Sequence, residues 1–549
     1  MYQNTPVNFQ NIFYGGEVLM KKFFKKMLAA AVTATCLIMP MSSQVEAAVE
    51  RTPVTVTNAR WYPAYHIAPY AGWANDPNGF CVYNGEYHFF YQHYPYDTQW
   101  GPMHWGHVKS KDLVHWENLP VAIEPDHIYD ASGGCFSGSG IEKDGKLYLI
   151  YTGHVDLPVI SKDYSDRIES QNVAVSDDGI NFTKIDENPV IFAPKVEGVS
   201  QCDFRDPKVW QHDGKYYVIV GSRTPTTDPA GTEANGQIVM FESTDLINWN
   251  FKNIIARGEG NQGFMWECPN FTTIDGQDVL IFSPQGVKPE GNKYLNWHQS
   301  VYMLGNLNYD TGIFTHGNFD ILDYGFDFYA PQITQALDGR TILIGWLDMW
   351  AGKFPEASDG WACQMTVPRE LHVKDGKLLT TPVKELETLR KSEVSYQNLN
   401  ITKKSLLKNI SGVTGELVTT IDAKNSFDIE LRSAGNEKTV LSYNAQTNIF
   451  KINRAKSGVF VESNNIAGMK TVEREVKLNP SDEIKLQIFL DRSSIEIFIN
   501  DGEAVMSTRV YPKETSQGIF FVPGKGSSMN IKNISFYTLG EGIPQPSVK

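Results

Sequence analysis

Three acidic residues stand in unusual local sequences and could carry chemistry. Asp76 lies in WANDPNGF, Asp206 in CDFRDPKVW and Glu267 in MWECPNF. Asp76 and Asp206 both precede proline, which favours an extended or turn conformation and could project each side chain from a loop. Brought together, carboxyl groups can act as general acid, general base or nucleophile. Taken singly, an Asp-Pro pair more often marks a plain turn, so the elements that position these residues matter.

A turn followed by an apolar strand recurs five times along the chain. The segments are YNGEYHFFY, KDGKLYLIY, HDGKYYVIV, DGQDVLIF and DGRTILIGW, and their turn glycines are separated by 60, 69, 62 and 63 residues. A second motif, SKDLVHW, SDDGINF and STDLINW, interleaves with the first. Two phased motifs in each unit of about sixty residues predict a five-bladed β-propeller over residues 60–385. Independent hairpins of a sandwich are the alternative.

The repeats stop soon after Leu371, and the composition then changes. The segment TPVKELETLRKSEV carries Leu386, Leu389 and a charged face, which suits one short connecting helix. Beyond it, GELVTTIDA, FDIELRS, IKLQIFLD and SSIEIFIN alternate apolar and polar residues with a period of two. This pattern is typical of half-buried strands. We therefore predict an all-β chain, with a linker at 386–398 and a C-terminal β-sandwich at 399–549.

The three acidic segments together resemble glycoside hydrolase family 32, the family of invertases, levanases and inulinases. Its hallmark segments, W-x-N-D-P-N-G, R-D-P and E-C, occur here intact and in order, and the resemblance covers essentially residues 60–540. By position, it implies that Asp76 is the nucleophile, Glu267 the general acid/base and Asp206 the carboxylate that stabilises the transition state. Ala74 is the one departure, because relatives often have a larger apolar residue there.

These roles make demands on the two reacting carboxyl groups. A retaining glycosidase places them about 5–5.5 Å apart, with one ionised and one protonated. Asp76 must therefore stay charged. We expect the apolar neighbours of Glu267 to raise its pKa and keep it protonated; they are Met265, Trp266, Cys268 and Pro269.

Further positions that match the family are expected to contact the substrate. Trp100 and Phe136 offer apolar faces to a sugar ring, with blade core as the alternative. Arg205 suits a structural ion pair as well as it suits a substrate contact. The full set is Asn75, Gln92, Trp100, Phe136, Ser137, Arg205, Tyr329 and Trp346. In the predicted sandwich, LDRSSIEIFIND also resembles the family, and Glu496 within it is expected to be an ordinary exposed strand residue. We interpret that domain as structural, or as an accessory glycan or oligomer surface.

The beginning of the chain resembles an export signal. From Met20 it has four lysines, an apolar stretch to about Met41 and small residues before a cleavage site near Ala47. We predict a secretory signal peptide at 20–47 and an extracellular protein. The apolar stretch is shorter than the roughly 20 residues that span a bilayer. Residues 1–19 are interpreted as a spurious extension, because Gly15-Gly16-Glu17 would be encoded by a purine-rich run like a ribosome-binding site; the choice between Met1 and Met20 as start stays open.

Charge and cysteine content exclude several classes of function. With 49 Lys+Arg, 63 Asp+Glu and a formal charge of −14, the chain is a poor partner for nucleic acid. Five widely spaced cysteines follow the cleavage site, without a CxxC pair, so neither a disulfide scaffold nor a zinc site is indicated and buried thiols are expected. We expect no cofactor and no metal, although calcium at an acidic loop is left open. The oligomeric state is also open.

The resemblance implies a hydrolase that removes terminal, non-reducing β-D-fructofuranosyl units, with sucrose as the first substrate. The segment DYGFDFYAPQ looks most like the branch that hydrolyses sucrose and sucrose 6-phosphate, but export argues against a phosphorylated substrate. Three alternatives remain: an exo-acting levanase or inulinase, a fructosyltransferase with the same triad, and a non-catalytic fructan-binding propeller. The intact Asp76, Asp206 and Glu267 argue against the last.

Overall fold

The structure is a computed structural model that describes residues 51–157, 166–228, 231–350, 352–461 and 472–549. The chain forms two compact units, Met1–Thr52 and Pro53–Lys549, and all the strands described below belong to the second. The extension at 1–19 and the signal peptide at 20–47 lie outside the described residues. Within those residues, no helix has the length and apolar content needed to cross a membrane.

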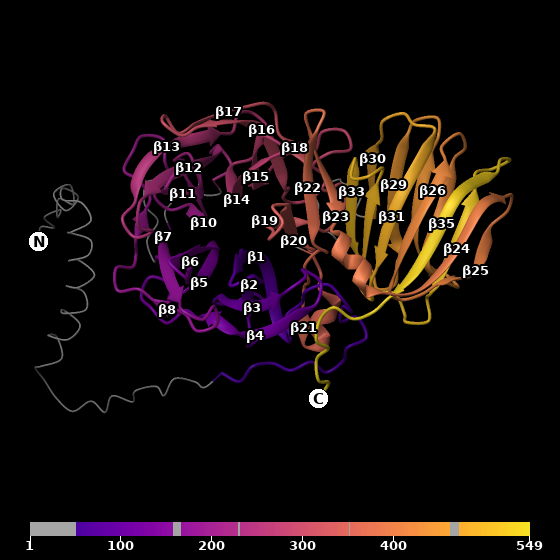
Figure 1. Ribbon diagram of the computed structural model, residues 1–549, viewed down its shortest axis with the longest axis horizontal. Coiled ribbons are helices and arrows are strands. Elements are labelled where there is room, and N and C mark those ends of the chain that lie inside the picture. The colour runs from indigo at the N-terminus through magenta and orange to yellow at the C-terminus, as the bar shows by residue number, and fades with distance from the viewer. Residues whose placement is uncertain (1–50, 158–165, 229–230, 351, 462–471) are drawn as a thin grey trace, which may run out of the picture. The chain divides into compact units, whose positions relative to one another are not determined.

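Five sheets of four or five strands occupy the first part of the second unit (Figure 1). The first contains β1 (Gly72–Tyr83), β2 (Glu86–Tyr94), β3 (His104–Ser110), β4 (Trp116–Ile123) and β21 (Trp361–Ala362). The second contains β5 (Gly134–Lys143), β6 (Lys146–Asp156), β7 (Arg167–Ser176), β8 (Thr183–Lys184) and β9 (Ile191–Phe192). The third contains β10 (Phe204–His212), β11 (Lys215–Arg223), β12 (Gly236–Ser243) and β13 (Asn250–Arg257).

The fourth sheet contains β14 (Met265–Ile274), β15 (Gln277–Gln285), β16 (Val301–Asn308), β17 (Ile313–His316) and β18 (Asp320–Ile321). The fifth contains β19 (Tyr329–Gln335), β20 (Thr341–Trp346), β22 (Arg369–Lys374) and β23 (Lys377–Pro382). Their first strands form a closed ring of contacts, because β1 contacts β5 and β19, and β10 and β14 complete the circle. After β20 the chain returns to the first sheet, where β21 pairs with β1 in parallel.

Turn chemistry and apolar packing explain this arrangement. At the first repeat, Asn84 and Gly85 both have positive φ, as a two-residue hairpin turn between β1 and β2 requires. Apolar side chains of neighbouring sheets then pack face to face; Phe90 and Leu149 share one cluster of the first and second sheets. The five cysteines that follow the predicted cleavage site are free and buried, as expected.

Two six-stranded sheets make up the remainder and pack around one apolar core, drawn in orange and yellow in Figure 1. One has the order β24 (Arg390–Ile401), β35 (Met529–Leu539), β26 (Gly415–Asp422), β31 (Glu483–Leu490), β32 (Ser494–Ile499) and β33 (Ala504–Arg509). The other has the order β25 (Ser405–Ser411), β34 (Gly518–Pro523), β27 (Phe427–Ala434), β28 (Glu437–Asn444), β29 (Ile449–Lys456) and β30 (Glu473–Lys477). The all-β prediction is confirmed.

The connection between the two parts differs from the sequence-based expectation in one respect. A short helix is present, but as the 3-10 helix η3 (Lys384–Leu389), with Leu386 and Leu389 buried. A second 3-10 helix, η2, spans Pro355–Asp359. The segment predicted as linker is largely strand, because β24 begins at Arg390 and pairs with β35. The sandwich thus follows the ring of sheets almost directly.

Glu496 on β32 corrects another expectation, since it is fully buried rather than exposed. Its Oε1 lies 2.9 Å from Nε2 of His66, and its Oε2 accepts a hydrogen bond from Arg369. Asp491 binds the other nitrogen of His66 at 2.7 Å. The period-two alternation is correct, but the polar face of β32 packs against the ring of sheets instead of solvent. We call His66, Arg369, Asp491 and Glu496 the His66 cluster.

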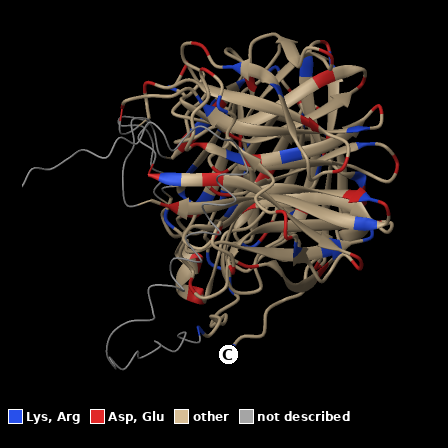
Figure 2. Ribbon diagram, turned by 90° about the vertical axis from the view of Figure 1, so that its left-hand side faces the viewer, with Lys and Arg blue, Asp and Glu red and all other residues tan. Residues whose placement is uncertain are grey.

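Charged side chains outside such clusters are mixed in sign. In the view of Figure 2, Lys and Arg alternate with Asp and Glu over the strands and loops, and neither sign covers a whole face. The excess of acidic residues is therefore spread over the surface in that view, which favours solubility and gives no basic patch for nucleic acid.

Candidate active site

Each of the five ring-forming strands carries an irregularity in its pairing. The register shifts fall between Ala74 and Pro77 on β1, Phe136 and Gly138 on β5, Arg205 and Lys208 on β10, Glu267 and Asn270 on β14, and Tyr329 and Gln332 on β19. Four of the five shifts include or flank a proline, namely Pro77, Pro207, Pro269 and Pro331. Proline has no N–H to donate to the ladder, so it favours a bulge there. Such bulges re-aim side chains.

Most of the predicted site residues line one cavity. Its volume is about 350 Å³, within the range of small-molecule sites. All three predicted catalytic carboxylates line it, with six of the predicted contact residues: Asn75, Gln92, Trp100, Phe136, Ser137 and Arg205. The ring of sheets thus gathers side chains that lie as far apart in sequence as Asn75 and Glu267.

The two remaining predicted contacts lie behind the wall of the cavity. Tyr329 is buried and donates a hydrogen bond to Oε2 of Glu267. It therefore orients Glu267 without lining the cavity itself. Trp346 is fully buried and packs edge to face on Trp73, with ring centroids 6.3 Å apart. The expectation that Trp346 contacts the substrate is therefore wrong, and Trp350 of the same segment lines the cavity instead.

Asp76 and Asp206 both lie next to the thiol of Cys268. Sγ of Cys268 lies 3.7 Å from Oδ2 of Asp76 and 3.6 Å from Oδ2 of Asp206. The amide of Cys268 also donates to Oδ2 of Asp206 at 2.9 Å. Asn75 and Ser137 donate to the two oxygens of Asp76 at 3.2 and 3.1 Å. These donors fix the orientation of both carboxylates.

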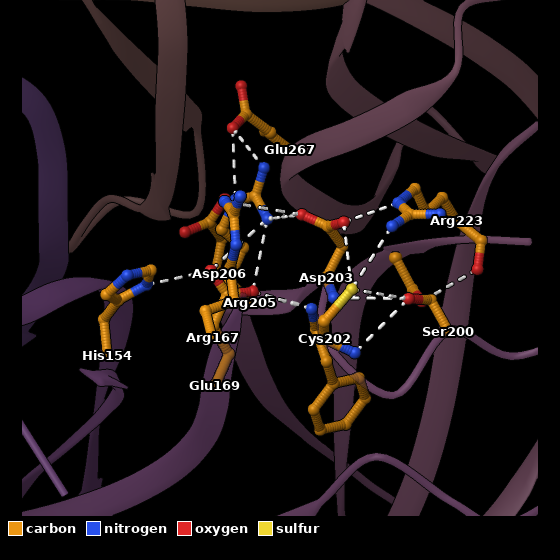
Figure 3. A network of polar contacts seen from close by, with 12 residues as sticks. His154, Arg167, Glu169, Ser200, Cys202, Asp203, Arg205, Asp206, Arg223 and Glu267 are labelled. Atoms are coloured by element: carbon orange, nitrogen blue, oxygen red, sulfur yellow. Dashed lines mark hydrogen bonds and ion pairs between the residues drawn. The ribbon is translucent and has the colours of Figure 1, made fainter. Parts of the chain in front are cut away.

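Glu267 is tied to a network of buried charges (Figure 3). Arg205 donates to its Oε1 from Nε at 3.1 Å and from Nη2 at 2.8 Å. The same guanidinium binds Asp203 at 2.8 Å and Glu169 at 3.2 Å. Arg223 also donates to Asp203. The ion-pair alternative for Arg205 is thus realised, while its guanidinium still lines the cavity.

The electrostatic balance of the cavity raises the pKa of two carboxyl groups. Burial, with the nearby charge of Glu267, raises the pKa of Asp76 to about 6. Burial also raises the pKa of Asp206 to about 8, with Arg205 opposing the shift and Glu267 and Asp76 adding to it. Asp76 is therefore mostly ionised at neutral pH, as expected. Together the three carboxyl groups hold about one proton between pH 6 and 8.

The expectation for Glu267 is wrong in this unliganded protein. Burial does raise its pKa, but Arg205, His298 and the hydrogen bond from Tyr329 lower it more, and the net direction is downward. The apolar neighbours in the sequence suggested the opposite. The deciding partners come from three other segments of the chain, and no local pattern around MWECPNF indicates them.

Several cavity residues escaped the sequence analysis. They are Arg167, Glu169, Gln285, His298 and Trp350. Arg167 and Glu169 lie two apart on β7, the spacing that puts both on one face of a strand, but that face was not known beforehand. Trp350 had a signal, since it ends the segment GWLDMW.

The aromatic wall of the cavity suits a sugar ring. Phe136 stacks on His154, with ring centroids 4.3 Å apart, which holds its face in place. Trp100 meets Phe136 edge to face at 6.1 Å and is 45% exposed, so much of its ring is free for a ligand. An apolar face beside fixed polar donors is the usual design of small-molecule sites.

Outside the cavity, one group of the described residues has the composition of a metal site, namely Asp348, Glu356 and Cys363. Asp348 pairs with the buried cation Arg509 at 2.7 Å, and Arg509 also pairs with Asp327. The group therefore takes part in the packing between the ring and the sandwich.

Comparison with known proteins identifies the family. Residues 66–382 match the glycosyl hydrolases family 32 N-terminal domain, and residues 385–538 match the glycosyl hydrolases family 32 C terminal. The chain is 40% identical over 500 residues to a sucrose-6-phosphate hydrolase of Zymomonas mobilis, covering 87% of this chain and 92% of that protein. It is 38% identical over 490 residues to a raffinose invertase of Escherichia coli, covering 89% and 97%.

Similar solved structures come from the same family. A GH32 beta-fructofuranosidase of Bombyx mori superposes with a TM-score of 0.76 at 34% identity, over 89% of this chain and 96% of that one. A sucrose-6-phosphate hydrolase of Lactobacillus gasseri gives a TM-score of 0.77 at 33% identity, over 89% and 95%. The chain therefore belongs to glycoside hydrolase family 32 and is a hydrolase of the β-fructofuranosidase type.

Proposed function

We propose that this enzyme releases terminal, non-reducing β-D-fructofuranosyl units from sucrose with retention of configuration. The observation that carries the proposal is the convergence of Asp76, Asp206 and Glu267 on one cavity of sugar size. The ring of five sheets supports the five-bladed propeller, and the two six-stranded sheets support the sandwich.

Each carboxyl group has a distinct task. Asp76, ionised and held by Asn75 and Ser137, attacks the anomeric carbon C2 and forms a fructosyl ester. Glu267 gives its proton to the leaving glucosyl oxygen, then takes a proton from the water that hydrolyses the ester. Asp206, fixed by the amide of Cys268, stabilises the positive charge that develops on the fructosyl ring.

The proton that Glu267 donates must be the one that the three carboxyl groups of the cavity share. Asp206 has the highest pKa of the three, so it is the resting place of that proton in the free enzyme. A positively charged transition state favours an ionised Asp206, and a leaving alkoxide favours a protonated Glu267. Substrate binding therefore promotes transfer of the proton toward Glu267.

Sucrose 6-phosphate is a second candidate substrate, favoured by one observation. The guanidinium of Arg167 lines the cavity, held by Asp166 at 2.6 Å, and an arginine there could bind a phosphate on the leaving sugar. Relatives include enzymes named sucrose-6-phosphate hydrolase. Sucrose is preferred here because the start of the chain resembles a signal peptide, and we propose that the enzyme acts outside the cell.

The test is a comparison of kcat/KM for sucrose, sucrose 6-phosphate, inulin and levan, with Glu267→Gln as the inactive control. The proposal predicts the highest value for sucrose and mainly free fructose and glucose at high sucrose concentration. A preference for sucrose 6-phosphate that Arg167→Gln abolishes would select the second candidate. A preference for inulin or levan would indicate a fructanase, and accumulation of trisaccharides would indicate a transferase.

The site of action needs its own measurement. N-terminal sequencing of the protein from culture medium and from cells of the native host separates the two compartments. A secreted product that begins near Ala48 is expected. Activity confined to the cells, on a chain that still carries residues 20–47, would contradict secretion.

A further inference from the structure

A second cavity lies away from the carboxylates, where the sandwich meets both ends of the second unit. Its volume is about 310 Å³. It is lined by Ala59 and Arg60 near the start of the unit, by Gln545 near its end, and by five sandwich residues: Val413, Arg432, Arg492, Pro512 and Glu514. Three arginines thus face one glutamate, in a chain whose formal charge is −14. Arg60 and Arg492 have carboxylate partners outside the lining, Asp359 and Glu541, whereas Arg432 has none in contact among the described residues.

Arg432 is the unusual member of this set. It is 2% exposed, and its backbone has φ of 47° at an irregularity of β27, a conformation rare for a residue with a side chain. Its Nε donates to the carbonyl of Ser516 at 2.8 Å and its Nη1 to that of Asp491 at 2.9 Å. Within the described part of the chain, its Nη2 has no hydrogen-bond acceptor, and no carboxylate lies within 4.0 Å of the guanidinium.

A buried guanidinium without a counter-ion is costly, because its hydration is lost and only neutral carbonyls replace it. Burial lowers the pKa of Arg432 to about 10, so it remains protonated at neutral pH. The carboxylate of Asp491 is nearby but already binds His66 at 2.7 Å. An anion in the cavity would supply the missing charge.

The other two arginines are held at the cavity wall by partners of their own. Arg60 pairs with Asp359 at 2.9 Å and lies over the ring of Trp61 at 3.9 Å. Arg492 donates to the carbonyl of Tyr62 at 2.8 Å and to the side chain of Gln545, and it pairs with Glu541 at 3.3 Å. These contacts restrict both side chains before any ligand arrives. Preorganised guanidinium groups are the preferred partners of phosphate oxygens.

We propose that this cavity is a binding site for a phosphate group. The three guanidinium groups would hold the phosphate oxygens, with Arg432 at the buried end of the site. Inorganic phosphate and a sugar phosphate offer the same group. The cavity exceeds the size of one phosphate ion, so a monosaccharide phosphate fits the space better. This inference is independent of the substrate proposed for the first cavity.

The test is thermal unfolding and calorimetric titration of the whole chain with sodium phosphate and with glucose 6-phosphate, at ionic strength matched with sodium chloride. A ligand that binds only the folded state raises Tm further with each increase in its concentration above Kd, whereas the calorimetric titration reaches saturation. We expect saturable binding of at least one probe, and tighter binding of glucose 6-phosphate would identify the sugar phosphate as the source. Chloride alone should have no such effect.

Variants of the lining residues test whether phosphate binds in this cavity. Arg492→Gln should weaken the affinity for phosphate at least tenfold, whereas Glu514→Gln should strengthen it, because it removes the only acidic group of the lining. Both should keep the wild-type kcat/KM for sucrose. Arg340→Gln is the matched control, since this arginine pairs with Asp338, Glu370 and Glu385 elsewhere on the ring, and it should leave the affinity for phosphate unchanged.

Two results would overturn the proposal. One is a response to both phosphate probes no larger than the response to chloride. The other is phosphate binding that survives Arg492→Gln but is lost in Arg167→Gln, which would assign the binding to the first cavity.

Discussion

The catalytic cavity and the His66 cluster are both built from buried carboxylates and cations, but they balance charge differently. In the His66 cluster, two carboxylates meet two cationic partners, and the pKa values of Asp491 and Glu496 are lowered despite burial. Of the three predicted catalytic carboxylates in the cavity, only Glu267 contacts a guanidinium, that of Arg205. The pKa values of Asp76 and Asp206 are raised instead.

This difference separates structure from function. Paired buried charges hold the sandwich onto the ring of sheets, whereas in the proposed mechanism a positively charged transition state balances the excess negative charge of the cavity. A site that is unfavourable when empty stabilises that state preferentially. The variants below change one side of the comparison at a time.

The largest expected effect is on activity. Asp76→Asn removes the nucleophile without changing its size, and kcat should fall by a factor of about 10⁴ or more. Steady-state hydrolysis of sucrose measures it, with circular dichroism to show an unchanged fold. Ser358→Ala, an exposed site that does not line the cavity, is the control. Residual activity within about tenfold of wild type would refute the assignment of the nucleophile.

The corresponding change in the His66 cluster should affect stability instead. Glu496→Gln leaves His66 and Arg369 without the charge they share, and the free energy of unfolding should fall by about 3–5 kcal/mol. Denaturant unfolding measures the loss. Glu483→Gln, which breaks a solvent-exposed pair with Lys532, should cost less than about 1 kcal/mol. Equal losses of unfolding free energy in the two variants would show that the cluster contributes no more than an exposed ion pair.

The stability of the His66 cluster should also depend on pH. Burial lowers the pKa of His66, but hydrogen bonds to Asp491 and Glu496 raise it more, to about 9. A raised pKa means that the contribution is complete below the unfolded-state value of 6.5 and is lost as the pH rises through 9. The loss should approach about 3 kcal/mol. Unfolding curves from pH 6 to 10 should show this slope in wild type, and its persistence in His66→Gln would contradict the assignment.

A smaller effect is expected on the pH profile of activity. kcat/KM should be bell-shaped, with apparent pKa values near 6 and 8 that belong to the three carboxyl groups together. Tyr329→Phe removes a hydrogen bond that favours ionised Glu267, so the alkaline limb should move to higher pH. A shift toward lower pH, or none, would mean that Tyr329 does not act on that proton.

Much of this organisation was accessible from the sequence. The spaced Asn-Gly and Asp-Gly turns reveal repeated hairpins. The two Asp-Pro pairs were expected to project from loops, whereas they lie at bulges within β1 and β10, because proline removes a ladder donor there. Such features depend on local backbone chemistry, which a single sequence contains. The same is true of the five buried thiols.

Other features depend on which distant strands meet. Glu169 lies on β7 without any motif, and its role follows only from its contact with Arg205 on β10. The lowered pKa of Glu267 has the same origin. Glu496 was placed on the correct face of its strand, but nothing in its neighbourhood tells that the ring of sheets covers that face. Trp346 and Trp350 lie on one segment, and only the packing decides which reaches the cavity.

The buried carboxylates of the empty catalytic cavity destabilise the folded protein, whereas the charges of the His66 cluster stabilise it. The most direct test is the free energy of unfolding of Asp76→Asn at pH 7, measured beside wild type and Glu496→Gln. Because burial raises the pKa of Asp76 to about 6, removing its charge should leave the protein as stable as wild type or more stable by up to about 3 kcal/mol. A loss of several kcal/mol, like that expected for Glu496→Gln, would contradict the account.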